Sequence, residues 1–112
     1  MDIGTARELA LSMPGAEERD HFGNPAYRVA GKGGRIFMTQ QLEAHTAVLM
    51  LDVEQQADLN ATHPRCFMPH PSKWGAKGAT LVMLDEVGVA VFKRALVTAW
   101  EHARPAPPRF DR

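Results

Sequence analysis

The sequence predicts a two-layer α+β domain, in which helices cover one face of an antiparallel five-stranded sheet. Apolar residues recur at helical spacing near both ends of the chain, and strand-like apolar runs lie between them. A capping signal in the middle of the chain predicts a further short helix. The expected order is helix, three strands, helix, two strands, helix. At 112 residues, of which 45% are hydrophobic, the chain has the size of one compact domain.

The first element is a helix over residues 5–13. Its apolar face comprises Ile3, Ala6, Leu9, Ala10 and Met13, at three- and four-residue spacing. Asp2 is placed to cap the start of this helix, and the Pro14–Gly15 pair ends it. The polar run at residues 16–24 is expected to be a loop.

A hairpin and the most apolar strand of the chain follow. Residues 26–29 and 35–40 flank a glycine-rich turn at 31–34, an arrangement typical of two paired strands. Residues 45–51 are apolar on both faces, as expected for a strand in the middle of a sheet. Together these runs predict three consecutive antiparallel strands.

The second half of the chain contains two helices and two strands. Asp52 and Gln55 have capping-box spacing, so a helix is expected over residues 53–62, and Pro64 ends it. Residues 66–68 are expected to add a short strand, and residues 79–84 a longer one. Asp85 is expected to cap the last helix. An apolar stripe on that helix, which must be buried against the sheet, comprises Val89, Phe92, Leu96, Trp100 and Ala103.

Residues 1–104 are expected to form a single domain, and residues 105–112, which are rich in proline, an extended tail. The chain has one cysteine, which excludes an intramolecular disulfide and agrees with a reducing compartment. Its first residues lack the apolar segment of a signal peptide. No run approaches the roughly 18 apolar residues of a membrane helix. We therefore expect a cytoplasmic protein that does not associate with membranes.

The charges are unevenly distributed, although the formal net charge is zero. No acidic residue lies between Asp20 and Glu43, or between Asp58 and Asp85. The basic residues inside these two acid-free segments are Arg28, Lys32, Arg35, Arg65, Lys73 and Lys77. One interpretation is that strands and loops rich in glycine and proline rarely carry acids. The other is that both segments contribute to one basic face.

The segment 63–83 combines prolines, glycines and an indole, which is typical of a shaped loop. In one interpretation, Trp74 folds back and plugs the end of the core. In the other, Trp74 and Lys77 form an exposed platform suited to a nucleotide base and its phosphate. A third possibility is a small-ligand pocket lined by His21, Tyr27 and Trp74.

The sequence contains no recognisable catalytic or metal-binding motif. His63, Cys66 and His70 do not follow the paired spacing of common zinc sites, so neither a metal nor a cofactor is expected. Neither serine of the chain lies in a nucleophile turn, and the glycine-rich turn lacks the spacing of a phosphate-binding loop. We therefore expect a protein that is not an enzyme.

Four stretches of the sequence, taken in order, carry a family resemblance. They are LALSMPGAEERDHFGNPAYRV, the GKGGRIF hairpin, HPRCFMPHPSKWGAKGATLVML, and the closing helix that ends in AW. In this combination and order the chain resembles the MmcQ/YjbR-like family. Ala79 departs from the family's pattern, in which a bulky or aromatic residue is expected at that position.

The resemblance implies a fold similar to bacterial frataxin-like (CyaY-like) and type III secretion-chaperone-like domains. It also implies the family's proposed role as a DNA-binding protein with two β-hairpin wings, the "double wing". On this sequence the wing candidates are Lys32 and Arg35 on the glycine hairpin, and Lys73 and Lys77 around Trp74.

Two function hypotheses follow. In the first, the domain binds DNA weakly and in a salt-dependent manner. Its contact residues would be Arg28, Lys32, Arg35, Lys73, Trp74 and Lys77. In the alternative, it is a protein-interaction domain, adaptor-like or chaperone-like, that uses the edge or the open face of the sheet. Phe37, Val48 and Met50 are candidates for that open face. In either case we expect a monomer or a weak dimer.

Overall fold

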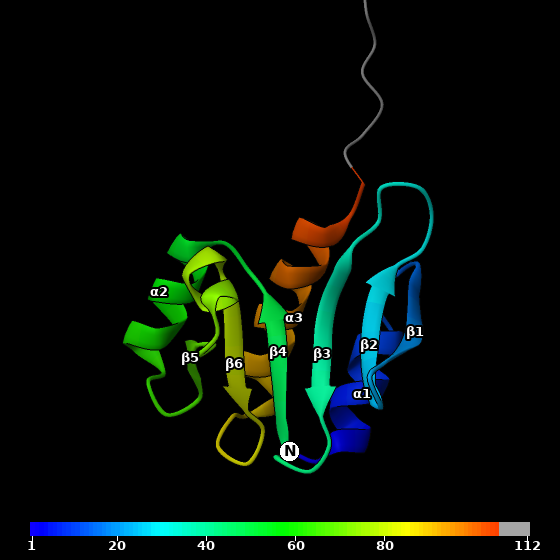
Figure 1. Cartoon of the computed structure of the whole chain (residues 1–112). Coiled ribbons are helices and arrows are strands. Elements are labelled where there is room, and N and C mark those ends of the chain that lie inside the picture. Colours follow the sequence, from blue (N-terminus) through cyan, green and yellow to red (C-terminus); the bar gives the residue numbers. More distant parts are fainter. Residues whose placement is uncertain (106–112) are drawn as a thin grey trace, which may run out of the picture.

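The computed structural model describes residues 1–105, in which three α-helices lie on one face of a six-stranded sheet (Figure 1). The helices are α1 (Ile3–Leu11), α2 (Val53–Thr62) and α3 (Val89–Ala103). The strands are β1 (Ala16–His21), β2 (Asn24–Val29), β3 (Ile36–Gln41), β4 (Thr46–Met50), β5 (Phe67–Pro69) and β6 (Ala79–Met83). A 3₁₀ helix, η1 (Lys73–Lys77), connects β5 to β6.

The sheet has the order β1-β2-β3-β4-β6-β5, and every neighbouring pair of strands is antiparallel. The predicted α+β class is therefore confirmed, as is the inner position of β4. Among the described residues, no helix has both the length and the apolar character required to cross a membrane.

The sixth strand is the main departure from the predicted fold. Residues 16–24, expected to be a loop, form β1 and a tight turn into β2. The charged sequence of β1 does not resemble a typical strand. It is compatible with an edge strand, where charges discourage pairing with other molecules. Phe22 and Gly23 form the turn with φ values of 53° and 85°, the positive values that a two-residue hairpin requires. The prediction of five strands was wrong by this one edge strand.

Two of the predicted helix caps are present. The Asp52 carboxylate accepts from the amide of Gln55 at 2.7 Å, and the Gln55 side chain accepts from the amide of Asp52 at 3.0 Å. Asp2 caps α1 by accepting from the amide of Thr5 at 2.7 Å. Helix α2 therefore has the predicted bounds, whereas α1 begins and ends two residues earlier than the predicted 5–13.

Other boundaries lie elsewhere along the chain. Gly88, and not Asp85, occupies the N-cap position of α3, because hydrogen-bonded turns over residues 83–87 separate Asp85 from the helix. Asp85 instead lies 3.3 Å from His45 Nδ1. Strand β5 begins and ends one residue later than predicted. Apart from its first residue, the tail predicted at 105–112 lies outside the described residues.

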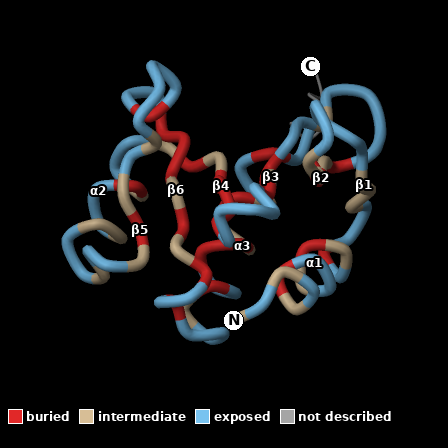
Figure 2. The backbone as a smooth tube through the Cα atoms, turned by 60° about the horizontal axis from the view of Figure 1, so that its bottom comes forward, coloured by how far each residue is buried: buried red, intermediate tan, exposed pale blue. Residues whose placement is uncertain are grey.

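The hydrophobic core lies between the sheet and the helical layer (Figure 2). Helix α3 buries Phe92 and Leu96 of its predicted apolar stripe completely, whereas Val89 in its first turn is half exposed. Trp100 packs at the border of the core, and its Nε1 donates to the carbonyl oxygen of Pro14 at 2.8 Å. This bond joins the end of α3 to the turn that follows α1.

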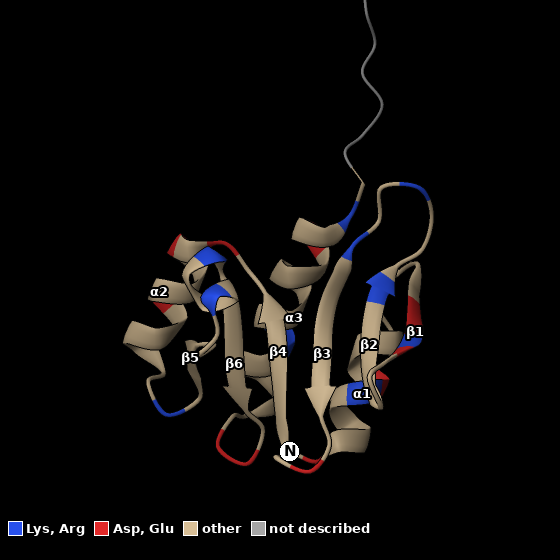
Figure 3. Ribbon diagram, in the orientation of Figure 1, with Lys and Arg blue, Asp and Glu red and all other residues tan. Residues whose placement is uncertain are grey.

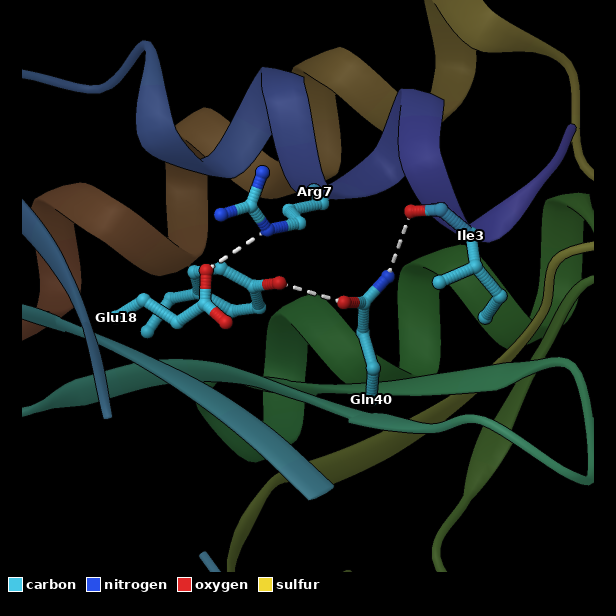
Figure 4. A network of polar contacts seen from close by, with 5 residues as sticks. Ile3, Arg7, Glu18 and Gln40 are labelled. Atoms are coloured by element: carbon cyan, nitrogen blue, oxygen red, sulfur yellow. Dashed lines mark hydrogen bonds and ion pairs between the residues drawn. The ribbon is translucent and has the colours of Figure 1, made fainter. Parts of the chain in front are cut away.

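A buried polar chain connects α1 to β2 and β3 (Figure 4). The Tyr27 hydroxyl donates to Gln40 Oε1 at 2.6 Å, and Gln40 Nε2 donates to the carbonyl oxygen of Ile3 at 3.0 Å. Burial, and secondarily the nearby Glu18 carboxylate, raises the pKa of Tyr27 to about 12. The hydroxyl therefore remains protonated, and able to donate, throughout the physiological pH range.

A bulge in β3 determines which of its residues face the core. The pairing register shifts between Tyr27 and Arg28 of β2, which leaves Phe37 as an extra residue on β3. Phe37 is fully buried in the core, so the expectation that it faces away from the helices was wrong. Val48 lies on the face opposite the helices, because its neighbour Leu49 belongs to the core and side chains alternate along a strand, but it is only 7% exposed.

We expect Gln40→Ala to lower the free energy of unfolding by about 2–4 kcal/mol. The substitution leaves the Tyr27 hydroxyl and the Ile3 carbonyl without partners and opens a cavity in the core. Urea unfolding measures the change. Gln41→Ala, one residue further along and exposed, is the matched control and should cost about 0.5 kcal/mol or less. Equal losses in the two variants would contradict the role assigned to Gln40.

Candidate functional site

Strands β3 and β4 separate toward the upper end of the sheet in Figure 1. Their paired register reaches only to Met38 on the β3 side. Beyond it, the Leu51 amide donates to the Gly78 carbonyl at 3.2 Å, while the Arg35 amide donates to the Ala103 carbonyl at 3.1 Å. The Leu51 bond extends the β4–β6 pairing by one residue, and the Arg35 bond joins the start of β3 to the end of α3.

A cleft of about 440 Å³ opens at this end of the sheet, and we call it the sheet-end cleft. Its residues are Arg35, Ile36, Met50, Leu51, Trp74, Lys77, His102 and Ala103. Apolar side chains therefore supply much of the lining, and Arg35 and Lys77 supply positive charge. Arg35 comes from one acid-free segment, and Trp74 and Lys77 come from the other. The fold brings the two segments together at one concave site.

Hydrogen bonds hold η1, which carries Trp74, in a fixed position. Ser72 caps this short helix by accepting from the amide of Trp74 at 3.2 Å. From α2, the buried Gln56 side chain donates to the carbonyl oxygens of Gly75 at 2.9 Å and of Ala79 at 3.0 Å. Gln56 therefore anchors both ends of the turn between η1 and β6.

Two glycines permit the close packing of this turn. A Cβ atom at Gly75 would lie 1.9 Å from the carbonyl oxygen of His70. A Cβ atom at Gly78, which has a φ of 111°, would lie 1.8 Å from the carbonyl oxygen of Leu51. Since no side chain fits these distances, both positions require glycine.

Trp74 does not plug the core. Its side chain is 52% exposed, and it lines the sheet-end cleft. The ammonium groups of Lys73 and Lys77 lie 5.6 and 5.0 Å from the centre of its ring, within the range of a cation–π interaction. The structure therefore presents an accessible indole with two adjacent cations.

The comparisons with known proteins identify the family. The YjbR family model matches residues 11–102, which is most of the chain. The chain belongs to the YjbR family. Among solved structures, it resembles the crystal structure of Deinococcus radiodurans protein DR2400, which has a DUF419 domain, with a TM-score of 0.73. The identity is 15%, and the match covers 88% of this chain and 75% of that one, so this likeness shows the fold alone. The search of curated proteins found no match.

The remaining basic candidates of this YjbR-family domain do not line the cleft. Lys73 is in η1 beside the indole. Lys32 is exposed in the loop between β2 and β3. Arg28, on β2, donates to the carbonyl oxygen of Gly34 at 3.1 Å, and its Nε lies 3.9 Å from Glu17. Arg28 is therefore partly engaged within the domain.

The residues of the alternative ligand pocket are not brought together. Tyr27 is completely buried, and its hydroxyl is bonded to Gln40. His21 is exposed at the end of β1, the outermost strand on one side of the sheet. Trp74 precedes β6, on the other side of β4. No single pocket can therefore include all three side chains.

The charges of the YjbR-family domain are unevenly distributed, although basic residues also mark α1 and the α2–β5 loop, away from the upper end (Figure 3). Basic residues mark η1, the β2–β3 loop, the end of β2 and the start of β3, all near the upper end of the sheet. The loops at the lower end, β3–β4 and β6–α3, carry the acids Glu43, Asp85 and Glu86. The upper end is not free of acids, since the start of α2 carries Asp52 and Glu54 and the last turn of α3 carries Glu101 (Figure 3). The electrostatic field around the domain is therefore uneven, although its net charge is zero.

Sequence reasoning missed the apolar lining of the cleft and His102 at the end of α3. Ile36 and His102 were assigned to no site, and Met50 was assigned only to the open face of the sheet, because no local signal marks these residues as lining a cleft. Within residues 1–105, no group of three or more His, Cys, Asp or Glu side chains is arranged to hold a metal ion.

We expect Gly75→Ala to destabilise the domain by about 2 kcal/mol or more, because its Cβ would overlap the backbone at His70. Trp74 fluorescence should also change, since η1 must move. Gly88→Ala is the matched control, because a Cβ at Gly88 meets nothing within 4 Å. Thermal unfolding of both variants measures the difference, and a Gly75→Ala variant as stable as the control would contradict the tight turn.

Proposed function

We propose that this YjbR-family domain is a non-enzymatic module that binds DNA at the upper end of its sheet. One observation carries the proposal: the two acid-free segments converge on the sheet-end cleft, where Arg35 and Lys77 flank the exposed Trp74. Lys73 lies beside the Trp74 ring, and Lys32 is exposed on the β2–β3 loop at the same end of the sheet. Phosphate contacts by such side chains supply sequence-independent affinity for nucleic acid.

The charge pattern also sets the expected strength of binding. About four to six phosphate contacts predict modest affinity that falls steeply with salt. Because Glu101 and Asp52 lie at the same end, the positive field is local and does not extend over a whole face. Binding should therefore be measured at low ionic strength first.

We expect Lys73→Glu combined with Lys77→Glu to weaken DNA binding by about tenfold or more and to reduce the salt dependence of the affinity. Fluorescence anisotropy of a labelled oligonucleotide, titrated at several salt concentrations, measures both effects. Both lysines are exposed and make no ion pair among the described residues, so the variant should remain folded.

Arg65→Glu combined with Lys93→Glu is the matched control. It makes the same change in net charge at exposed positions outside the sheet-end cleft. Equal weakening by the two double variants would mean that binding reflects net charge only. Absence of binding at high micromolar protein and low salt would reject DNA as the partner.

A second function, protein interaction, is favoured by Phe22. Its ring is 93% exposed at the tip of the β1–β2 turn, in a left-handed backbone conformation that costs a residue of this type about 1 kcal/mol. Leu42, which is 41% exposed, lies in the β3–β4 turn beside Asn24. Edge pairing is less favoured, because β1 carries charges and β5 is short and ends in proline. The tip, and not a sheet edge, is the stronger candidate surface.

We expect Phe22→Asn to raise the free energy of unfolding by about 0.5–1 kcal/mol, because asparagine tolerates the positive φ. The same change should abolish capture of a protein partner by the immobilised domain. Urea unfolding and affinity capture from a cell extract measure the two effects, with Phe22→Tyr as the control that keeps the ring. Retained capture by Phe22→Asn would reject this surface.

A further inference from the structure

The sheet-end cleft combines two kinds of chemistry that a flat phosphate-binding surface does not need. Its walls are apolar, formed by Ile36, Met50 and Leu51, and Trp74 presents a half-exposed ring to it. Its volume of about 440 Å³ lies within the range of roughly 300–1,000 Å³ typical of small-ligand sites. Cations stand beside this apolar lining. A ligand that uses the whole cleft must therefore be both flat and apolar in one part and anionic in another.

We infer that the cleft holds one unpaired nucleotide of a DNA strand, an inference that rests on the proposed DNA-binding function. The base would stack on Trp74 against the apolar walls, and its phosphates would contact Lys77 and Arg35. The Arg35 guanidinium uses one N–H on the carbonyl oxygen of His102, and a guanidinium has further donors for a phosphate. A simple anion would leave the walls unused, and a purely apolar ligand would leave the cations unused.

A base inside a double helix cannot enter such a site. In duplex DNA both faces of a base are covered by its neighbours, and a base reaches a pocket only when it is unpaired or extruded, at a cost of a few kcal/mol. The domain should therefore prefer single-stranded or locally unpaired DNA to a perfect duplex. A surface that contacts phosphates alone would show no such preference.

In the unbound protein, two lysines occupy the face of the cleft's indole ring. The ammonium groups of Lys73 and Lys77 lie over the Trp74 ring in the unbound protein. A stacking base must displace at least one of them, and the strand that brings the base also brings the phosphates that receive the displaced cation. Because both lysines are exposed and linked to the backbone by flexible stems, this exchange requires no change of fold.

The test compares three labelled oligonucleotides by fluorescence anisotropy at low salt: a single strand, its perfect duplex, and the duplex with one central unpaired base. We expect the single strand and the bulged duplex to bind about tenfold more tightly than the perfect duplex. Trp74→Ala should remove most of this preference and leave duplex binding nearly unchanged, whereas Trp74→Phe should retain part of it. Phe22→Ala removes an exposed ring elsewhere and should leave the preference intact.

The outcomes separate this inference from the proposed function. If none of the oligonucleotides binds, both are overturned. If all three bind equally, or if Trp74→Ala weakens all three equally, DNA binding stands and the nucleotide cleft is overturned. A free mononucleotide that displaces the single strand at its own low micromolar concentration would also overturn it, because the cleft would then serve a small metabolite and not a strand.

Discussion

The separation of β3 and β4 is the constraint on which the site depends. Two antiparallel strands that part inside a sheet leave backbone amides that must bond elsewhere, since a buried unpaired amide costs about 1–3 kcal/mol. Here the Arg35 amide bonds to Ala103 at the end of α3, whereas the Leu51 amide, which faces β6, bonds to Gly78 in register with the β4–β6 pairs. The Arg35 bond fixes one side of the cleft against α3, and the Leu51 bond fixes the other side against β6.

The glycines of the second segment complete this arrangement. The Gly78 carbonyl can accept from the Leu51 amide only because Gly78 has no Cβ atom, which would overlap the Leu51 carbonyl oxygen. Gln56, buried beneath the turn, then bonds to Gly75 and Ala79 and holds η1 at the rim of the cleft. The hydrogen bonds of Ser72 and Gln56 thus hold the backbone on both sides of Trp74, and its ring is 52% exposed. The exposed indole is therefore carried by a hydrogen-bonded segment, and not by a loose loop.

The sequence predicted the features with local causes and missed those set by distant partners. The capping box of Asp52 and Gln55 and the apolar stripe of α3 depend on residues a few positions apart, and both are present. Strand β1 was missed because its sequence is highly charged. Such a sequence forms a strand only at the edge of a sheet, and here the edge position results from pairing with β2. Phe37 was assigned to the wrong face of the sheet because the bulge that turns it into the core arises from the pairing of β3 with β2, which the sequence of β3 alone does not reveal. The basic residues of the site were recognisable, but their meeting at one cleft depends on the separation of β3 and β4.

The contacts that Lys73 and Lys77 make with the Trp74 ring are weaker than the base stacking that the proposed function requires there. A cation–π contact at an exposed site contributes about 0.5–1 kcal/mol, whereas stacking of a base on an aromatic side chain contributes about 1–3 kcal/mol. Lys73 and Lys77 therefore cover the ring in the free domain without blocking a stronger occupant. In the proposed complex with DNA, each lysine would replace a weak contact with the ring by a charge-assisted hydrogen bond to a phosphate. Base stacking and phosphate binding would thus reinforce each other, so that an isolated base and an isolated phosphate should each bind more weakly than the two joined in one strand.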